Sequence, residues 1–189
     1  MPQEDEFRMS KKEADICKEL EGGTGFARFL WYGAQNQYRV LVQQHLGPPL
    51  EDLLAYCSGR FSLKTVLLIA GQALARLEHM HNRGIVHRDI KPEHFLLGLH
   101  KQGSTLYLID FGLASEGNVP VWTGRDEPPQ RQCFMGTRDY ASLNAHRGLG
   151  WSFHCNEKGH ANGSTEQSRG DDLECLGYVM LRCLLGELP

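Results

Sequence analysis

The sequence lacks several features that would each point to a particular class of protein. No apolar run among its 189 residues is long enough to cross a bilayer as a helix. Its six cysteines form no Cys-x-x-Cys pair, so we expect free thiols in a reducing compartment rather than a disulfide framework. Basic residues are not in excess, because 20 Lys and Arg stand against 23 Asp and Glu. This balance argues against binding to nucleic acid or to a membrane surface.

The N-terminus is also unlike a targeting segment. Residues 1–6 are acidic and polar, so they do not read as a secretory signal, and we expect a cytoplasmic or nuclear protein. His154, Cys155 and His160 lie in a Gly-rich segment, but three such residues at chance spacing are weak evidence for zinc. A hydrophobic fraction of 41% is sufficient for one domain or a little more. The sequence does not indicate an oligomeric state.

Apolar spacing and turn residues predict a chain of mixed helices and short strands. Residues 1–9 are expected to be disordered, and Ser10 with Glu13 forms a capping box for a helix that ends near Leu20. Residues 111–170 are polar and expected to be irregular. The predicted strands are 26–30, 38–43, 85–86, 95–97 and 106–109, and the predicted helices are 50–56, 62–82 and 171–185. The run Leu176–Leu181 is apolar nearly all round, which predicts burial on all sides.

Two short motifs indicate the chemistry. One is His87-Arg88-Asp89, followed by Ile-Lys-Pro, and the other is Asp110-Phe-Gly after a short apolar run. Either motif alone is common by chance, but both in this order, each flanked by strand-forming residues, are not. Together they resemble the catalytic loop and the metal-binding turn of a protein kinase.

This resemblance implies transfer of the ATP γ-phosphoryl group with the help of Mg²⁺. It assigns the base that accepts the substrate hydroxyl proton to Asp89 and the contact with the moving phosphoryl group to Lys91. Asp110 would bind the metal through its carboxylate oxygens, which suit magnesium. The Lys91-Pro92 pair resembles serine/threonine kinases rather than tyrosine kinases, so the implied partners are protein substrates with Ser or Thr.

Further segments resemble the casein kinase I family. The sequence Tyr140-Ala-Ser-Leu-Asn144 replaces the Ala-Pro-Glu of most kinases, which is characteristic of that family. The resemblance covers about residues 10–189 and rests also on Leu46–Leu53, Phe61–Val66, His94–Gly98, Gly136-Thr137 and Gln167–Glu174. It implies an α+β, kinase-like fold of two lobes.

The resemblance also assigns residues around the nucleotide by their position in the family's motifs. Leu46 would face adenine from a hinge that begins at Gln44, behind a gatekeeper at Gln43, and Leu96 would form the floor of the pocket. Glu13 would pair with an ATP-orienting Lys. Each has a simpler interpretation, because Glu13 caps a helix, Gln43 lies on an exposed strand and Leu96 is core in any fold.

Two more residues acquire roles around the catalytic loop. Thr137 would hydrogen-bond to Asp89 and Lys91. Asp172 would anchor the loop from the last helix.

The implied domain is partial. Residues 10–44 would form the end of the smaller lobe, and residues 45–189 would form the first half of the mainly helical larger lobe. No Gly-rich phosphate loop and no strand Lys precede Glu13 in this sequence. Residues 150–165 interrupt a loop that is short in the family, either as a functional insert or as a translated intron or gene-model error.

Two substitutions depart from the family pattern at its chemistry. His94 stands where kinases have the Asn that holds the second magnesium ion, and imidazole nitrogen is a poor magnesium ligand. We therefore predict weak or absent turnover of magnesium–ATP. Asp139 stands where the family has an Arg for phosphate on pre-phosphorylated substrates, so the preference for such substrates should be weaker.

The leading interpretation is a casein kinase I-like serine/threonine protein kinase. The alternative is a catalytically impaired pseudokinase or kinase fragment that serves as a protein-interaction module. An unrelated α+β domain is a remote third interpretation, since the two motifs occur in order.

Overall fold

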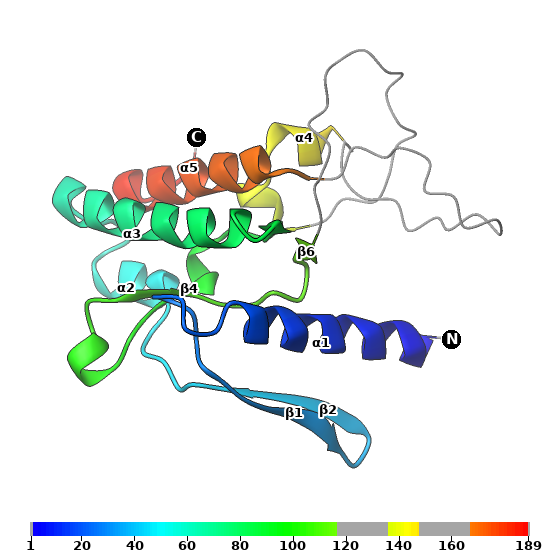
Figure 1. Cartoon of the computed structure of the whole chain (residues 1–189). Coiled ribbons are helices and arrows are strands. Elements are labelled where there is room, and N and C mark those ends of the chain that lie inside the picture. The colour runs from blue at the N-terminus through cyan, green and yellow to red at the C-terminus, as the bar shows by residue number, and fades with distance from the viewer. Residues whose placement is uncertain (1, 117–135, 148–166, 189) are drawn as a thin grey trace.

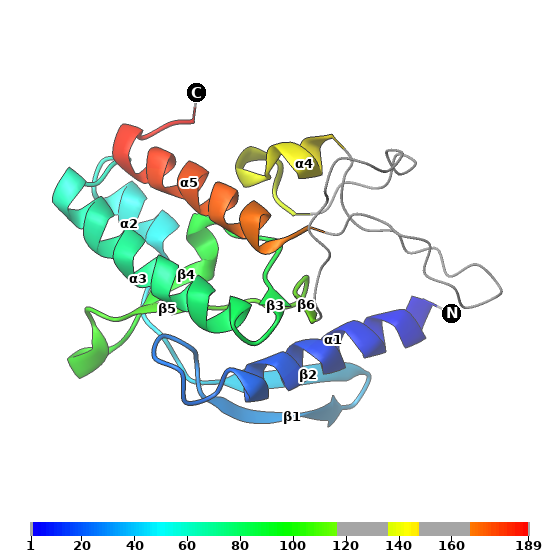
Figure 2. The same ribbon diagram turned by 45° about the horizontal axis from the view of Figure 1, so that its top comes forward.

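A computed structural model of the chain describes residues 2–116, 136–147 and 167–188. A long helix and a β-hairpin lie together along one side of the molecule (Figure 1), and these are α1 (Pro2–Glu19), β1 (Phe29–Gln35) and β2 (Tyr38–Gln43). The other side contains three helices, as the tilted view in Figure 2 also shows, and these are α2 (Leu50–Tyr56), α3 (Leu63–His81) and α5 (Arg169–Leu185). A short helix, α4 (Leu143–His146), lies beside the start of α5.

Short strands and single helical turns occupy the space between these two parts. Every sheet in the described residues is a pair of antiparallel strands. The pairs are β1 with β2, β3 (Ile85–Val86) with β6 (Ser115–Glu116), and β4 (Phe95–Leu97) with β5 (Leu106–Leu108). The 3₁₀ turns are η1 (Pro92–His94), η2 (His100–Gln102) and η3 (Arg138–Tyr140). The predicted α+β class is therefore confirmed.

Helix α3 shows how local sequence determines this fold. Ser62 precedes its first turn, and its hydroxyl accepts a hydrogen bond from the Thr65 N–H at 3.2 Å, which satisfies one exposed donor of the helix start. Apolar residues at helical spacing, including Ala73 and Leu77, are fully buried. The structure thus confirms the helix predicted over residues 62–82, with Ser62 and Asn82 as its caps.

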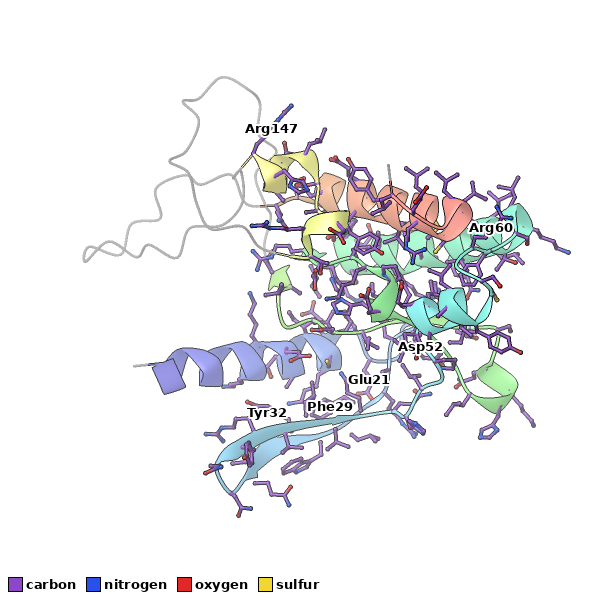
Figure 3. All side chains as sticks on the ribbon, turned by 180° about the vertical axis from the view of Figure 1, so that it is seen from behind. Glu21, Phe29, Tyr32, Asp52, Arg60 and Arg147 are labelled. Atoms are coloured by element: carbon purple, nitrogen blue, oxygen red, sulfur yellow. The ribbon has the colours of Figure 1, made fainter. Side chains whose placement is uncertain are left out.

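One hydrophobic core joins the helices to the short strands that carry the loops between them. Ile16 of α1, Leu77 of α3 and Val179 of α5 are fully buried in it, together with Phe95 of β4. Phe29 packs against this core from the hairpin (Figure 3). The loops that follow β3 and β5 are therefore attached to a rigid centre.

The structure corrects the predicted start of the chain. Helix α1 begins at Pro2, so residues 2–9 are helical rather than disordered, and Ser10 lies inside the helix instead of capping it. The predicted helix start at Ser10 was therefore placed too late along the chain.

The first strand was also predicted too early. Strand β1 runs from Phe29 to Gln35, whereas the prediction ended it at Leu30. Phe26 lies beside β5 instead, because Leu108 N–H donates to the Gly25 carbonyl at 2.9 Å and Phe26 forms a parallel bridge with Leu108. Strand propensity alone had assigned Phe26 to the hairpin, but in the structure it pairs with Leu108.

The final helix is buried on one face only. Leu176 and Val179 are buried against the core, but Leu181 is 40% exposed, so the expectation of burial on all sides was wrong for the described residues. Helix α3 covers one face of α5. The region 111–170 likewise contains the regular elements β6, η3 and α4, which the prediction of irregular structure did not include.

Among the described helices, none combines the length and the apolar character that crossing a membrane requires.

The burial of the cysteines gives a direct test of this fold. Cys57 is exposed, whereas Cys17, Cys175 and Cys183 are buried, and burial raises the pKa of each of these three thiols to about 12. Thiolate is the reactive form, so a maleimide at pH 8 should label Cys57 faster than the buried three by roughly a hundredfold or more. Peptide mass spectrometry after timed labelling measures the rates. Rapid labelling of Cys175 in the native protein would contradict the packing of α5.

Candidate functional site

The loop over residues 87–91 is held by one buried carboxylate, Asp172 of α5. Its Oδ1 accepts a hydrogen bond from the Arg88 backbone N–H at 2.8 Å. Its Oδ2 accepts from the His87 backbone N–H at 2.8 Å and from His81 Nε2 at 2.9 Å. The Asp172 side chain has no exposed surface, and these three donors replace the water that a carboxylate would otherwise need. Asp172 thereby lies where the family resemblance placed a loop anchor.

Backbone strain marks two positions in this site. Arg88 has a φ of 69° and Asp110 a φ of 66°, in the left-handed region that non-glycine residues rarely adopt. Arg88 is fixed there by its bond to Asp172 and by its Nε, which donates to the Leu113 carbonyl at 2.7 Å. Strain of this kind persists only where the surrounding structure enforces it, so both residues are held in set orientations.

His87 connects the two motifs. Its Nε2 lies 3.1 Å from the carbonyl of Ile109, directly before Asp110, and its Nδ1 accepts the Asp89 N–H at 3.3 Å. The ring therefore carries its proton on Nε2 and is neutral. Burial lowers the pKa of His87, which agrees with that state. His87 thus fixes the distance between Asp89 and Asp110.

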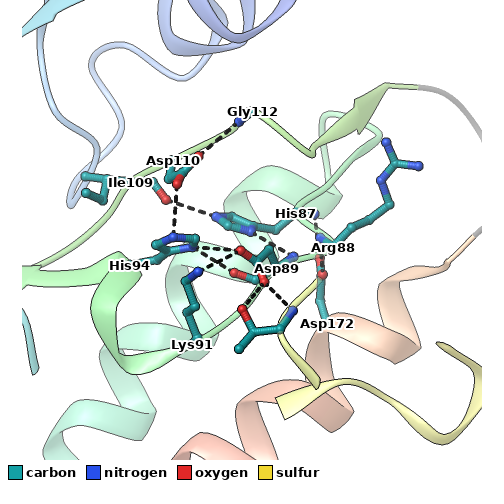
Figure 4. Close-up of polar contacts among 10 residues, drawn as sticks. His87, Arg88, Asp89, Lys91, His94, Ile109, Asp110, Gly112 and Asp172 are labelled. Carbon is teal, nitrogen blue, oxygen red and sulfur yellow. Dashed lines mark hydrogen bonds and ion pairs between the residues drawn. The ribbon is translucent and has the colours of Figure 1, made fainter. Parts of the chain in front are cut away.

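Asp89 is oriented by contacts to both of its carboxylate oxygens. Oδ1 accepts hydrogen bonds from the backbone N–H and the hydroxyl of Thr137, each at 2.9 Å. Oδ2 lies 3.1 Å from Lys91 Nζ (Figure 4). The expected bond between Thr137 and Asp89 is present, but Lys91 contacts the opposite Asp89 oxygen rather than Thr137. The three residues that the sequence singled out for catalysis therefore meet in one place.

His94 lies between Asp89 and Asp110. Its Nδ1 is 2.8 Å from the Asp89 carbonyl oxygen, and its Nε2 is 3.0 Å from Asp110 Oδ2 (Figure 4). Both partner atoms are oxygens, so each ring nitrogen contacts an acceptor. The His94 side chain is only 7% exposed. Its ring therefore spans the two motifs through both of its nitrogens.

Asp110 is the most exposed member of the site, with a side chain that is 51% exposed. The hydrogen bond from His94 lowers the pKa of Asp110 to about 2, helped by the electrostatic interaction with that ring and by the bond that its Oδ1 accepts from the Gly112 N–H at 3.3 Å. Asp110 is consequently ionised at neutral pH.

Glu13 of α1 lies close enough to Asp110 to interact with its carboxylate. Burial raises the pKa of Glu13, and the negative charge of Asp110 raises it further. The side chain lies close to the Asp-Phe-Gly turn, since its carboxylate is 3.9 Å from where a Cβ on Gly112 would stand. Glu13 is thus a partly buried acid directed into the site, more than a helix cap.

A small apolar cluster adjoins these charged groups. Leu46 is 8% exposed and clusters with Ala27 and Tyr107, and the partly buried side chains of Leu96 and Ile109 pack against them. The two residues predicted to contact adenine, Leu46 and Leu96, therefore belong to one apolar patch. Such a patch, beside convergent polar groups, is typical of a ligand pocket.

The two glutamines next to this patch have separate contacts. Gln43 Nε2 donates to Cys17 Sγ at 2.7 Å, which connects the hairpin to α1. Gln44 Oε1 accepts the Arg28 N–H at 3.3 Å, and its Nε2 donates to Gln102 Oε1 at 3.3 Å. Gln43 is half-buried by this contact, so the simpler interpretation of an exposed strand residue does not describe it.

The two metal-ligand candidates differ in how well they suit magnesium. Asp110 fits, because it offers an ionised and half-exposed carboxylate, the ligand type that magnesium prefers. His94 does not fit, since both of its nitrogens already bond to protein oxygens. In the residues that the structure describes, no group of three or more His, Cys, Asp and Glu side chains is arranged to hold a metal ion. The possible zinc ligands His154, Cys155 and His160 lie outside the described residues, as does the insertion at 150–165.

Sequence reasoning missed the residues that secure the Ser-Leu-Asn segment. Asp171 Oδ1 accepts hydrogen bonds from Ser142 Oγ at 2.6 Å and from Asn144 Nδ2 at 3.2 Å. Glu174 Oε1 accepts the Leu143 N–H at 3.0 Å. For Asp171 the signal was present, because it lies in the first turn of α5, where acidic residues commonly bind nearby donors. Asp139, by contrast, lies exposed on η3, where the sequence predicted a loss of phosphate binding.

The chain was also compared with known protein families. Residues 2–144, about three quarters of the chain, match the family model described as "Protein kinase domain".

Removal of the buried anchor should destabilise the whole molecule. Asp172→Ala leaves the N–H groups of His87 and Arg88 and the His81 ring without their acceptor, at a cost of about 1–3 kcal/mol for each unsatisfied group. We expect the free energy of unfolding in urea to fall by at least about 3 kcal/mol. The exposed Asp15→Ala is the control and should stay within about 0.5 kcal/mol of the wild type. Equal effects of the two substitutions would show that Asp172 is not an anchor.

Proposed function

The chain belongs to the protein kinase domain family, and on that premise we propose that it transfers the γ-phosphoryl group of ATP to Ser and Thr hydroxyls of protein substrates. The observation that supports this most is the arrangement of Asp89, held by Thr137 through Oδ1 and paired with Lys91 through Oδ2. A carboxylate with one oxygen fixed and the other beside a cation is suited to orient a hydroxyl and accept its proton.

Each residue of the site has a defined part in this reaction. Asp89 accepts the proton of the attacking Ser or Thr hydroxyl. Lys91 Nζ, 3.1 Å from that carboxylate, contacts the transferred phosphoryl group and offsets its charge. Asp110 holds the metal through its exposed carboxylate. When bound, magnesium–ATP supplies the phosphoryl group together with a cation that neutralises the phosphate oxygens.

The apolar patch accounts for nucleotide binding in this proposal. Leu96 would form the floor under adenine, and the backbone of Leu46 would contact its edge, with Gln44 at the start of the same segment. Glu13 of α1 would pair with an ATP-orienting Lys, as in the family. Residues 10–44 then contribute the smaller lobe and residues 45–189 the larger one. These assignments are supported by the packing of Leu46 with Leu96 and by the approach of Glu13 to Asp110.

Two sequence features support Ser/Thr specificity and a casein kinase I-like identity. Lys91-Pro92 follows the base as in serine/threonine kinases. The Ser142-Leu-Asn144 segment is tied to α5 through Asp171, so the residues that distinguish the casein kinase I family have a structural task in this chain. These bonds hold in place the segment that contains Thr137, which donates hydrogen bonds to Asp89.

The reaction itself gives the first test. With γ-labelled ATP, magnesium and a mixed Ser, Thr and Tyr peptide library, the 189-residue chain should label Ser and Thr, at a low rate because His94 stands where kinases have a metal-binding Asn. Asp89→Asn should lower the rate by about 10²–10⁴-fold, because the base is lost. Asp52→Asn on the exposed surface of α2 (Figure 3) is the matched control and should keep the wild-type rate. Label on Tyr alone, or equal rates for Asp89→Asn and Asp52→Asn, would contradict the proposal.

Asp139 gives a test of substrate preference. Its exposed carboxylate should repel phosphate on a pre-phosphorylated peptide, and Asp139→Arg should attract it. We expect the substitution to raise kcat/KM for peptides with an upstream phosphoserine by about tenfold, without a change for the unphosphorylated peptides. Steady-state kinetics on paired peptides measures both values. A wild-type enzyme that already prefers the phosphorylated peptide would contradict the prediction.

A further inference from the structure

We propose that this site takes a single divalent cation with its nucleotide, because the ring of His94 fills the place of a second. The inference rests on the proposed nucleotide-binding function of the same site. Kinases use two magnesium ions, the second held by the Asp-Phe-Gly carboxylate and a catalytic-loop Asn. In this chain the residue at that position is His94, and its contacts decide how many ions the site can hold.

The ring of His94 is fixed in place. Its backbone N–H donates to the Lys91 carbonyl at 3.1 Å, and its own carbonyl accepts the Ile109 N–H at 3.0 Å. The ring packs against that of His87 with centroids 5.7 Å apart. The side chain is 7% exposed and bonds at both nitrogens. A swing of the ring away from the site would break both bonds and leave a cavity beside His87.

The contacts of His94 close one side of Asp110 and leave another open. Asp110 Oδ2 lies 3.0 Å from His94 Nε2, so a metal between these two residues would have to displace the ring. The ring also presents no oxygen, which magnesium requires. Half of the Asp110 side chain is nevertheless exposed, and that face can hold one ion.

An Asn at position 94 would reverse this arrangement. Its amide has both a donor NH₂ group and an acceptor oxygen. The NH₂ group can replace His94 Nδ1 as the donor to the Asp89 carbonyl, while the amide oxygen is available to a metal at Asp110. His94→Asn therefore keeps the bond to the 87–91 loop and restores an oxygen ligand.

The number of bound ions tests the inference directly. Mn²⁺ would be titrated into the 189-residue chain saturated with a non-hydrolysable ATP analogue, and free Mn²⁺ would be measured by its EPR signal. We expect the wild type to bind one ion per chain and His94→Asn to bind two, the second at least about tenfold tighter than in the wild type. His100→Asn, the same substitution at an exposed histidine on η2, should remain at one ion.

The outcomes separate this inference from the proposed function. Two ions on the wild-type chain with nucleotide bound would overturn the single-ion inference and leave the kinase proposal intact. A count of one in His94→Asn that retains the wild-type melting temperature would also overturn it. If that variant does not fold, the wild-type count still decides. A wild-type chain that binds no nucleotide analogue would overturn the proposed function, and the inference with it.

Discussion

The arrangement of the site depends on the buried carboxylate of Asp172. This group accepts hydrogen bonds from two consecutive backbone N–H groups of the 87–91 loop and from the His81 ring. An ionised group without solvent is stable only when such donors surround it. Its position therefore couples α3, α5 and the loop, and the left-handed conformation of Arg88 persists because Asp172 enforces it.

Two histidine rings connect the 87–91 loop to the Asp110-Phe-Gly motif. His87 binds the carbonyl before Asp110, and His94 binds both the Asp89 carbonyl and Asp110 Oδ2. The two acids are thus held at a set separation by side chains that are buried themselves. The hydrogen bond between His94 and Asp110 also lowers the pKa of Asp110 and keeps that acid ionised.

Much of the fold was predictable where the signal is local. The bounds of α2 and α3 agree with the prediction, because apolar spacing, a Ser cap and flanking turn residues lie within the segments themselves. Strand β1 was misplaced, since Phe26 is drawn to Leu108, about eighty residues away. Propensity contains no information about such a partner. The choice of Asp89, Lys91 and Asp110 needed only the motifs, whereas Asp171 and Glu174 become visible only when α4 meets α5.

The sequence by itself determined the kind of chemistry, because the residue types and the spacing of the two motifs can be recognised without knowledge of the fold. It also showed that His94 is unusual. Only the tertiary structure decided what His94 does, since its partners Asp89 and Asp110 lie on different loops whose separation is fixed by His87 and Asp172. A hydrogen bond requires two atoms within about 3 Å, and proximity of that kind arises only when the core brings distant segments together.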